Sequence, residues 1–138
     1  MSVEFGYTPA VAISGQERDA FVQFARLAVR AAGEVILPHF RSGVQVTNKL
    51  ENGGFDPVTL ADQAGERAIR EAIERTYPEH GIFGEEYGFQ AGNGLTWVID
   101  PIDGTRAFMT GMLHWGVLLA LFDGESPVVG AMYQPYTD

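Results

Sequence analysis

Two stretches of the chain repeat apolar residues every three or four positions, which is the spacing of an amphipathic helix. The first follows Ser14 and Glu17, which are spaced as a capping box, and it ends at Pro38. The second follows Thr59 and Asp62, which have the same spacing. The apolar positions are Phe21, Phe24, Ala28, Ala31, Ala32 and Val35 in the first stretch, and Ala64, Ala68, Ile69, Ala72 and Ile73 in the second. We therefore predict two helices, with Asp62 in the first turn of the second.

Acidic and basic side chains fill the other positions of the second predicted helix. They are Glu66, Arg67, Arg70, Glu71 and Glu74. Such a mixture is typical of a solvated helix face on which charges four residues apart form pairs. We therefore expect this face to lie in water.

Shorter runs with β character lie between and after the predicted helices. They span residues 44–49, 81–84, 97–99, 115–122 and 127–133. The first run leads into a loop at residues 51–54, and the last two are joined by the turn signal Asp123-Gly124, so the chain ends on a hairpin. Trp115, Phe122 and Tyr133 are interpreted as core residues. The pattern indicates an α/β fold with helices layered on a sheet.

Two of these runs lead directly to a carboxylate, namely Glu85 and Asp100, so we expect both acids at strand ends. Asp103 follows three residues later, and Gly104-Thr105 then opens a helical turn whose free N–H groups can hold an anion. Two carboxylates and a phosphate repel one another, by roughly 4 kcal/mol for unit charges ~4 Å apart at an effective dielectric constant of ~20. A hard cation with oxygen ligands removes this conflict, which favours Mg²⁺ or Mn²⁺ over zinc.

Composition and charge narrow the classes of function. The chain has 138 residues, of which 46% are hydrophobic, so it can form one domain with a substantial core. Its net charge is −9, and it lacks the basic clusters that bind nucleic acid. It contains no cysteine, which excludes disulfides and thiolate chemistry. Since neither a secretory signal nor an apolar run of about 20 residues is visible, we expect no membrane partner and a cytoplasmic location. His39, His80 and His114 lack metal-ligand spacing and are interpreted as surface or packed residues.

In combination, three motifs resemble the inositol monophosphatase superfamily. In order, they are Asp56-Pro57-Val58-Thr59-x-x-Asp62, Gly84-Glu85-Glu86, and Trp97-Val98-Ile99-Asp100-Pro101-Ile102-Asp103-Gly104-Thr105. The similarity extends from about the first predicted helix to the last residue. It implies a layered α/β fold in which residues 1–138 form the N-terminal half, with two helices and a mainly antiparallel sheet. Within the superfamily, Gly104-Thr105-Arg106-Ala107-Phe108, Gly111 and Trp115-Gly116 resemble the histidinol-phosphate phosphatase branch.

The resemblance also implies roles for individual residues. Mg²⁺ ions, two or three in number and replaceable by Mn²⁺, would be held by Glu85, Asp100, Asp103 and the carbonyl group of Ile102. Thr105 would orient a water molecule while Asp62 accepts the threonine proton, and Gly104, Thr105 and Arg106 would bind phosphate. Lys49 matches the family's loop lysine. Glu86 is expected to face solvent or to support a neighbour.

The implied activity is Mg²⁺-dependent hydrolysis of a small polar phosphate ester by a homodimeric enzyme. Histidinol phosphate is the favoured substrate, and inositol 1-phosphate or a sugar or nucleotide 3′-phosphate is the alternative. An aspartyl-phosphate phosphotransferase fits less well, because its acids are spaced Asp-x-Asp, and a non-catalytic metal-binding or interaction module is the alternative of another class. Relatives are roughly twice as long and take a further metal-binding Asp from their C-terminal half, so we expect this chain to be truncated or partial.

Overall fold

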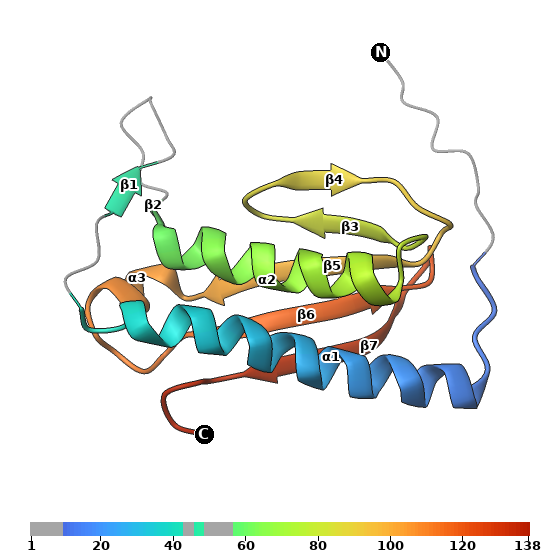
Figure 1. Ribbon diagram of the computed structural model, residues 1–138, viewed down its shortest axis with the longest axis horizontal. Coiled ribbons are helices and arrows are strands. Elements are labelled where there is room, and N and C mark those ends of the chain that lie inside the picture. The colour runs from blue at the N-terminus through green and yellow to red at the C-terminus, as the bar shows by residue number, and fades with distance from the viewer. Residues whose placement is uncertain (1–9, 43–45, 49–56) are drawn as a thin grey trace, which may run out of the picture.

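Two long helices lie side by side against one face of a five-stranded sheet (Figure 1). The structure, a computed structural model, describes residues 10–42, 46–48 and 57–138. The helices are α1 (Gly15–Ile36), α2 (Leu60–Thr76) and α3 (Thr105–Met109), and a 3₁₀ turn, η1, spans Leu37–His39. The strands are β1 (Val46–Asn48), β2 (Pro57–Thr59), β3 (Gly81–Gly84), β4 (Gly88–Gln90), β5 (Thr96–Asp103), β6 (Gly116–Phe122) and β7 (Pro127–Tyr133). The predicted layered α/β fold is confirmed, with α3 as the predicted helical turn.

The start of α1 follows the sequence signal closely. The Ser14 side chain accepts a hydrogen bond from the Glu17 amide at 3.1 Å, and the Glu17 carboxylate accepts one from the Ser14 amide at 3.2 Å, as a capping box requires. The predicted apolar stripe is slightly misplaced at its end, because Val35 is 39% exposed whereas Ile36 is fully buried. Within the described part of the chain, none of the helices is both long and apolar enough to cross a membrane.

The main sheet has the strand order β4-β3-β5-β6-β7. Only β3 and β5 run parallel, and the other three neighbouring pairs are antiparallel, so the sheet is mainly antiparallel as predicted. The terminal hairpin of β6 and β7 is also confirmed. Strands β1 and β2 form a separate antiparallel pair. Strands β2 and β4 were not predicted, because three residues are too few to establish a period of two. The predicted loop at residues 51–54 lies outside the described residues.

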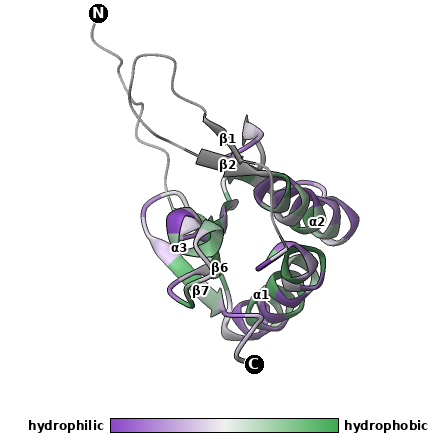
Figure 2. Ribbon diagram, turned by 90° about the vertical axis from the view of Figure 1, so that its left-hand side faces the viewer, coloured by the Kyte–Doolittle hydropathy of each residue, from purple (hydrophilic) through white to green (hydrophobic). Residues whose placement is uncertain are grey.

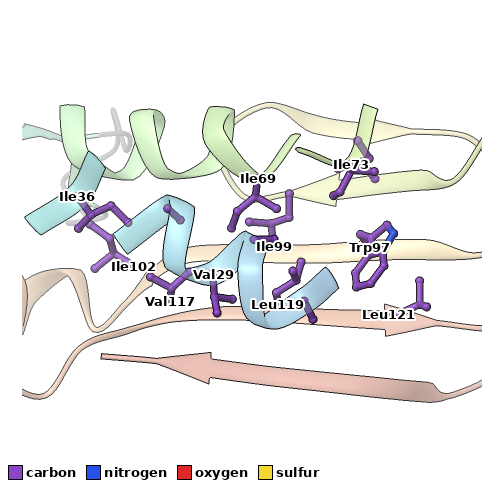
Figure 3. Packing of buried hydrophobic residues seen from close by; sticks show 14 of the residues in the cluster. Val29, Ile36, Ile69, Ile73, Trp97, Ile99, Ile102, Val117, Leu119 and Leu121 are labelled. Atoms are coloured by element: carbon purple, nitrogen blue, oxygen red, sulfur yellow. The ribbon is translucent and has the colours of Figure 1, made fainter. Parts of the chain in front are cut away.

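The core lies between the helices and one face of the sheet (Figure 3). Alternate residues of β5 and β6 point into it, and Ile69 and Ile73 of α2 meet them there. The fully buried residues of these elements include Ile69, Ile73, Trp97, Val117 and Leu121. Burying a large aliphatic side chain contributes about 1.5–3 kcal/mol, so this layer supplies much of the stability of the fold. Trp115 is buried as predicted, whereas Phe122 and Tyr133 are only partly buried.

The opposite face of the sheet carries exposed apolar side chains. Phe83 is 51% exposed, Phe89 65% and Met132 77%. Figure 2 shows α1 and α2 together on one side of β6 and β7. In the described part of the chain, these two helices contact β5, β6 and β7 from that side alone, so the other face is open to solvent.

Candidate active site

Strand β5 does not end at Asp100, as the sequence led us to expect, but continues to Asp103. Its register against β6 shifts between these acids, since Asp100 pairs with Leu118 and Asp103 with Gly116. Two residues of β5, Pro101 and Ile102, therefore face one residue of β6, which is a β-bulge. Proline has no N–H group for the ladder, and within a sheet it is tolerated at a bulge of this kind.

The bulge decides where the two acids point. In a regular strand, residues three apart point to opposite faces, because side chains alternate with a period of two. The extra residue restores the alternation, so that Asp100 and Asp103 lie opposite β6 residues that share one face. The Asp-x-x-Asp spacing is thus compatible with a joint site.

Glu85 comes from the neighbouring strand. It follows β3 directly, as predicted, and β3 runs parallel to β5 with Gly84 opposite Ile99. Parallel strands bring their carboxyl ends to the same edge of a sheet, so Glu85 lies one position beyond this pair, level with Asp100. A hydrogen bond between the Asp100 and Glu85 side chains reflects this arrangement.

Two helices complete the cluster of acids. Asp62, in the first turn of α2, is only 1% exposed. The Thr105 hydroxyl group, at the start of α3, lies 3.3 Å from an Asp62 carboxylate oxygen and 3.1 Å from the carbonyl oxygen of Ile102. The structure therefore brings together the threonine and the aspartate that the sequence singled out as partners, and it adds Ile102 as a second acceptor. The side chain of Thr59, the other half of the predicted capping box, lies outside the described residues.

The pKa of Asp100 reflects its burial and the acids near it. Burial is the largest cause of its shift, and the hydrogen bond with Glu85 and the charges of Glu85, Asp103 and Asp62 add to it, raising the pKa of Asp100 to about 7. Its Oδ1 atom is buried and accepts no hydrogen bond from the described residues. A buried carboxylate oxygen without a partner is costly, and a bound cation would satisfy it.

The donor set fits a hard cation. Every candidate ligand is an oxygen atom, from Glu85, Asp100, Asp103 or the Ile102 carbonyl group, and Mg²⁺ and Mn²⁺ prefer such ligands. Among the described residues, however, no three acids or histidines already surround a common point at metal-binding distances. The other acids are therefore close enough to raise the pKa of Asp100 but are not closed around an ion.

The candidate phosphate-binding residues surround the start of α3. Gly104 precedes this helix with a positive φ of 87°, and no side chain caps the helix start. A β-carbon at residue 104 would overlap the carbonyl oxygen of His114, so only glycine fits this position. Arg106 is exposed. Lys49 lies outside the described residues.

The prediction from the sequence was wrong for one acid, Glu66. Glu66 was expected on the solvated face of α2, yet it is fully buried. It shares the helical spacing of Ile69 and Ile73, three and seven residues later, and this signal could have revealed its position. Its carboxylate accepts hydrogen bonds from the backbone amides of Glu86 and Tyr87, the residues that follow Glu85. These bonds involve the Glu86 backbone, and the expectation for the Glu86 side chain stays a prediction.

Comparison with known proteins gives consistent matches. The sequence pattern described as the inositol monophosphatase family matches residues 17–138. A fructose-1,6-bisphosphatase/inositol-1-monophosphatase of Aquifex aeolicus is 37% identical over 119 residues, covering 86% of this chain and 45% of the relative. A histidinol-phosphatase of Chlorobaculum parvum is 39% identical over 123 residues, covering 82% of this chain and 46% of the relative.

A solved structure agrees with the fold. The extragenic suppressor protein suhB of Bartonella henselae superposes with a TM-score of 0.80 at 28% identity, covering 86% of this chain and 46% of that protein. The chain thus spans about half the length of the relatives that it matches.

Proposed function

Because this chain belongs to the inositol monophosphatase family, we propose that residues 1–138 form the N-terminal metal- and phosphate-binding part of a Mg²⁺-dependent phosphomonoesterase. One observation carries the proposal. Asp100, with its buried and unsatisfied Oδ1 atom, interacts with Asp103 of its own strand and with Glu85 and Asp62 from other elements. Such a concentration of negative charge is costly in a purely structural role but suits a site for cations.

Glu85, Asp100, Asp103 and the carbonyl group of Ile102 would hold the ions. The chemistry that bound Mg²⁺ supplies is Lewis-acid activation of water and neutralisation of the phosphate charge. Glu85 lies at an exposed position at the rim of this group, where it also borders the water.

Thr105 and Asp62 would act on the attacking water. The Thr105 hydroxyl group would take a proton from the attacking water while it passes its own proton to Asp62, for which their 3.3 Å separation is suitable. The N–H groups of Gly104 and Thr105, together with Arg106, hold the phosphate. Attack by water needs no covalent intermediate. Acid-quench trapping of a labelled phosphoenzyme would instead indicate an aspartyl-phosphate mechanism.

Histidinol phosphate is the substrate that we favour. The residues from Gly104 to Phe108, followed by Gly111 and Trp115-Gly116, support this choice, as does the similarity to a protein named histidinol-phosphatase. Similarity to a protein named fructose-1,6-bisphosphatase/inositol-1-monophosphatase supports the alternative, a sugar or inositol phosphate.

A phosphate-release assay tests the function. The protein is incubated with Mg²⁺ and either histidinol phosphate, inositol 1-phosphate or 3′-phosphoadenosine 5′-phosphate. We expect Mg²⁺-dependent release that is abolished by chelation and is greatest with histidinol phosphate. Release of no phosphate from any ester, by the protein in its full length, would favour a non-catalytic module.

A further inference from the structure

Glu66 is a buried charge with an unusual set of partners. Its Oε1 atom accepts the amide of Glu86 at 2.8 Å, and its Oε2 atom accepts the amide of Tyr87 at 2.8 Å. A carboxylate bound through both oxygens to consecutive amides fixes the orientation of that backbone segment, and such charge-assisted bonds are the strong ones. The segment is the turn between β3 and β4, which carries Glu85.

The Glu66 carboxylate also pairs with Arg70, which lies four residues later in the same helix. Arg70 donates its Nε–H to Oε2 at 3.0 Å, and its side chain is only 13% exposed. The same guanidinium group donates to the carbonyl oxygen of Gly88, at the far end of the turn. Glu66 therefore holds the middle of the turn and Arg70 its far end, both from α2.

Gly84 makes this close approach possible. A β-carbon at residue 84 would overlap the Glu66 carboxylate group. Because Gly84, the last residue of β3, has no side chain, the Glu66 carboxylate can lie directly against the backbone there. Replacing Glu66 by an apolar residue would leave two partly buried amides without these acceptors, which explains why a charge is tolerated in this core.

We propose that Glu66 is a positioning residue that holds the 84–88 turn so that Glu85 reaches Asp100 and completes the cation site. This inference rests on the proposed function, because it takes Glu85 to be a metal ligand. Glu66 itself touches neither metal nor substrate. It acts through the backbone N–H groups of Glu86 and Tyr87.

The variant Glu66→Gln tests the proposal with little change in volume. A glutamine side chain can accept only one of the two amides and turns its NH₂ group toward the other. We expect faster hydrogen exchange at the Glu86 and Tyr87 amides, measured by NMR on the metal-free protein. We also expect affinity for Mn²⁺, measured by electron paramagnetic resonance, to fall by about 10–100-fold, the range for groups that orient metal ligands.

Two control variants separate positioning from other effects. Glu71→Gln removes a charge from an exposed site on the same helix, and Ile73→Val weakens the core below it. Neither should change the Mn²⁺ affinity by more than about twofold. Should Glu66→Gln fail to fold, Arg70→Gln serves as a milder variant with effects in the same direction.

The outcomes distinguish the two proposals. If the wild-type protein binds Mn²⁺ and Glu66→Gln binds it equally well, the positioning role is wrong and the metal site stands. If the wild-type protein in its full length binds no Mn²⁺, the metal site is wrong, and the positioning role falls with it. Equal amide exchange in Glu66→Gln and wild type would also overturn the positioning role.

Discussion

At the scale of single residues, Asp100 combines two properties that normally exclude each other in a core. It is partly buried, and it lies within interaction range of three other acids. Its pKa of about 7 follows from both. Because the ordinary value is near 3.8, the metal-free native state retains a proton between pH 4 and 7 that the unfolded state has released. Asp100 therefore lowers the stability of the metal-free fold as the pH rises through this range.

Asp100→Asn should remove this loss and also remove a metal ligand. In the presence of chelator, we expect the variant to gain stability relative to wild type as the pH rises from 4 to 7. With millimolar Mg²⁺, the melting temperature should rise for wild type but not for the variant, because a ligand that binds only the native form stabilises it. Calorimetry measures both effects. Asp19→Asn, at an exposed position of α1, is the control, and an equal response of Asp100→Asn to Mg²⁺ would contradict the ligand role.

Activity gives a second readout of the same variant. We expect Asp100→Asn to lose activity in a phosphate-release assay with the protein in its full length, because a carboxylate of the proposed metal site is missing. Retention of more than about a tenth of the wild-type kcat at saturating Mg²⁺, roughly 1.4 kcal/mol of barrier, would exclude the proposed role of Asp100 in holding the ions.

His80 is a buried neutral histidine rather than a ligand. It is 4% exposed, and its Nδ1 atom accepts a hydrogen bond from the Trp97 indole at 3.0 Å. Burial lowers its pKa below the ordinary 6.5, while the nearby Glu79 opposes the shift. Below pH 6.5 the unfolded state therefore binds a proton that the native state does not, and stability falls until the lower native pKa is reached.

His80→Asn should weaken this acid dependence, because the amide oxygen can replace Nδ1 as an acceptor but does not titrate. Denaturant titrations of wild type and variant between pH 5 and 7.5 measure the difference in unfolding free energy. We expect wild type to lose more stability than the variant on acidification. His114→Asn, at an exposed position, should leave the profile unchanged. Parallel profiles for wild type and His80→Asn would show that His80 does not cause the dependence.

At the scale of elements, the site is formed where four of them meet. Strands β3 and β5 provide their carboxyl ends, α2 its first turn and α3 its first residue. The Thr105 hydroxyl group is the direct link between the two helices. Its partners are an acid and a backbone carbonyl group, so the hydroxyl is oriented by acceptors at a fixed place beside the acids.

Thr105→Ala should lower kcat by at least about 100-fold with little change in Mg²⁺ affinity, because general-base groups contribute roughly 10²–10⁴-fold. Steady-state kinetics over a range of Mg²⁺ concentrations separate these quantities. Thr105→Ser retains the hydroxyl group and should keep most of the activity. A comparable loss of Mg²⁺ affinity in Thr105→Ala would instead make Thr105 a metal ligand.

At the scale of the whole molecule, the described chain has one covered and one open sheet face. Phe83, Phe89 and Met132 present apolar surface on the open side, and β7 is an edge strand of the sheet. A hollow of about 310 Å³ on the same side is lined by Val98, Asp100 and Leu118, among others. Contiguous apolar surface and an unpaired strand edge favour association with other chains.

Residues 1–138 expressed alone should therefore self-associate and show very low activity. The variant Met132→Lys should shift the population toward monomer, because a charge on the open face opposes its burial. Leu27→Lys is a matched control, since Leu27 is 70% exposed on α1, away from that face. Light scattering over a concentration series gives the masses. A monodisperse wild-type monomer with full activity would contradict both expectations.

The sequence alone was enough to predict the two long helices, to recognise the family and to propose candidate site residues. Apolar residues at helical spacing, the Ser14 capping box and three contiguous motifs are all local signals, so no knowledge of distant contacts was needed to recognise them. The carboxylates Glu85, Asp100 and Asp103 were proposed as site residues for the same reason.

Only the tertiary structure decided how these residues meet. The bulge at Pro101 and Ile102 depends on pairing with β6, and the position of Glu85 beside Asp100 depends on the parallel pairing of β3 with β5. Glu66 was taken for a solvent-exposed charge because the two amides that compensate its burial lie 20 and 21 residues away. Whether a charge can be buried depends on partners that folding brings together, and a local pattern does not contain them.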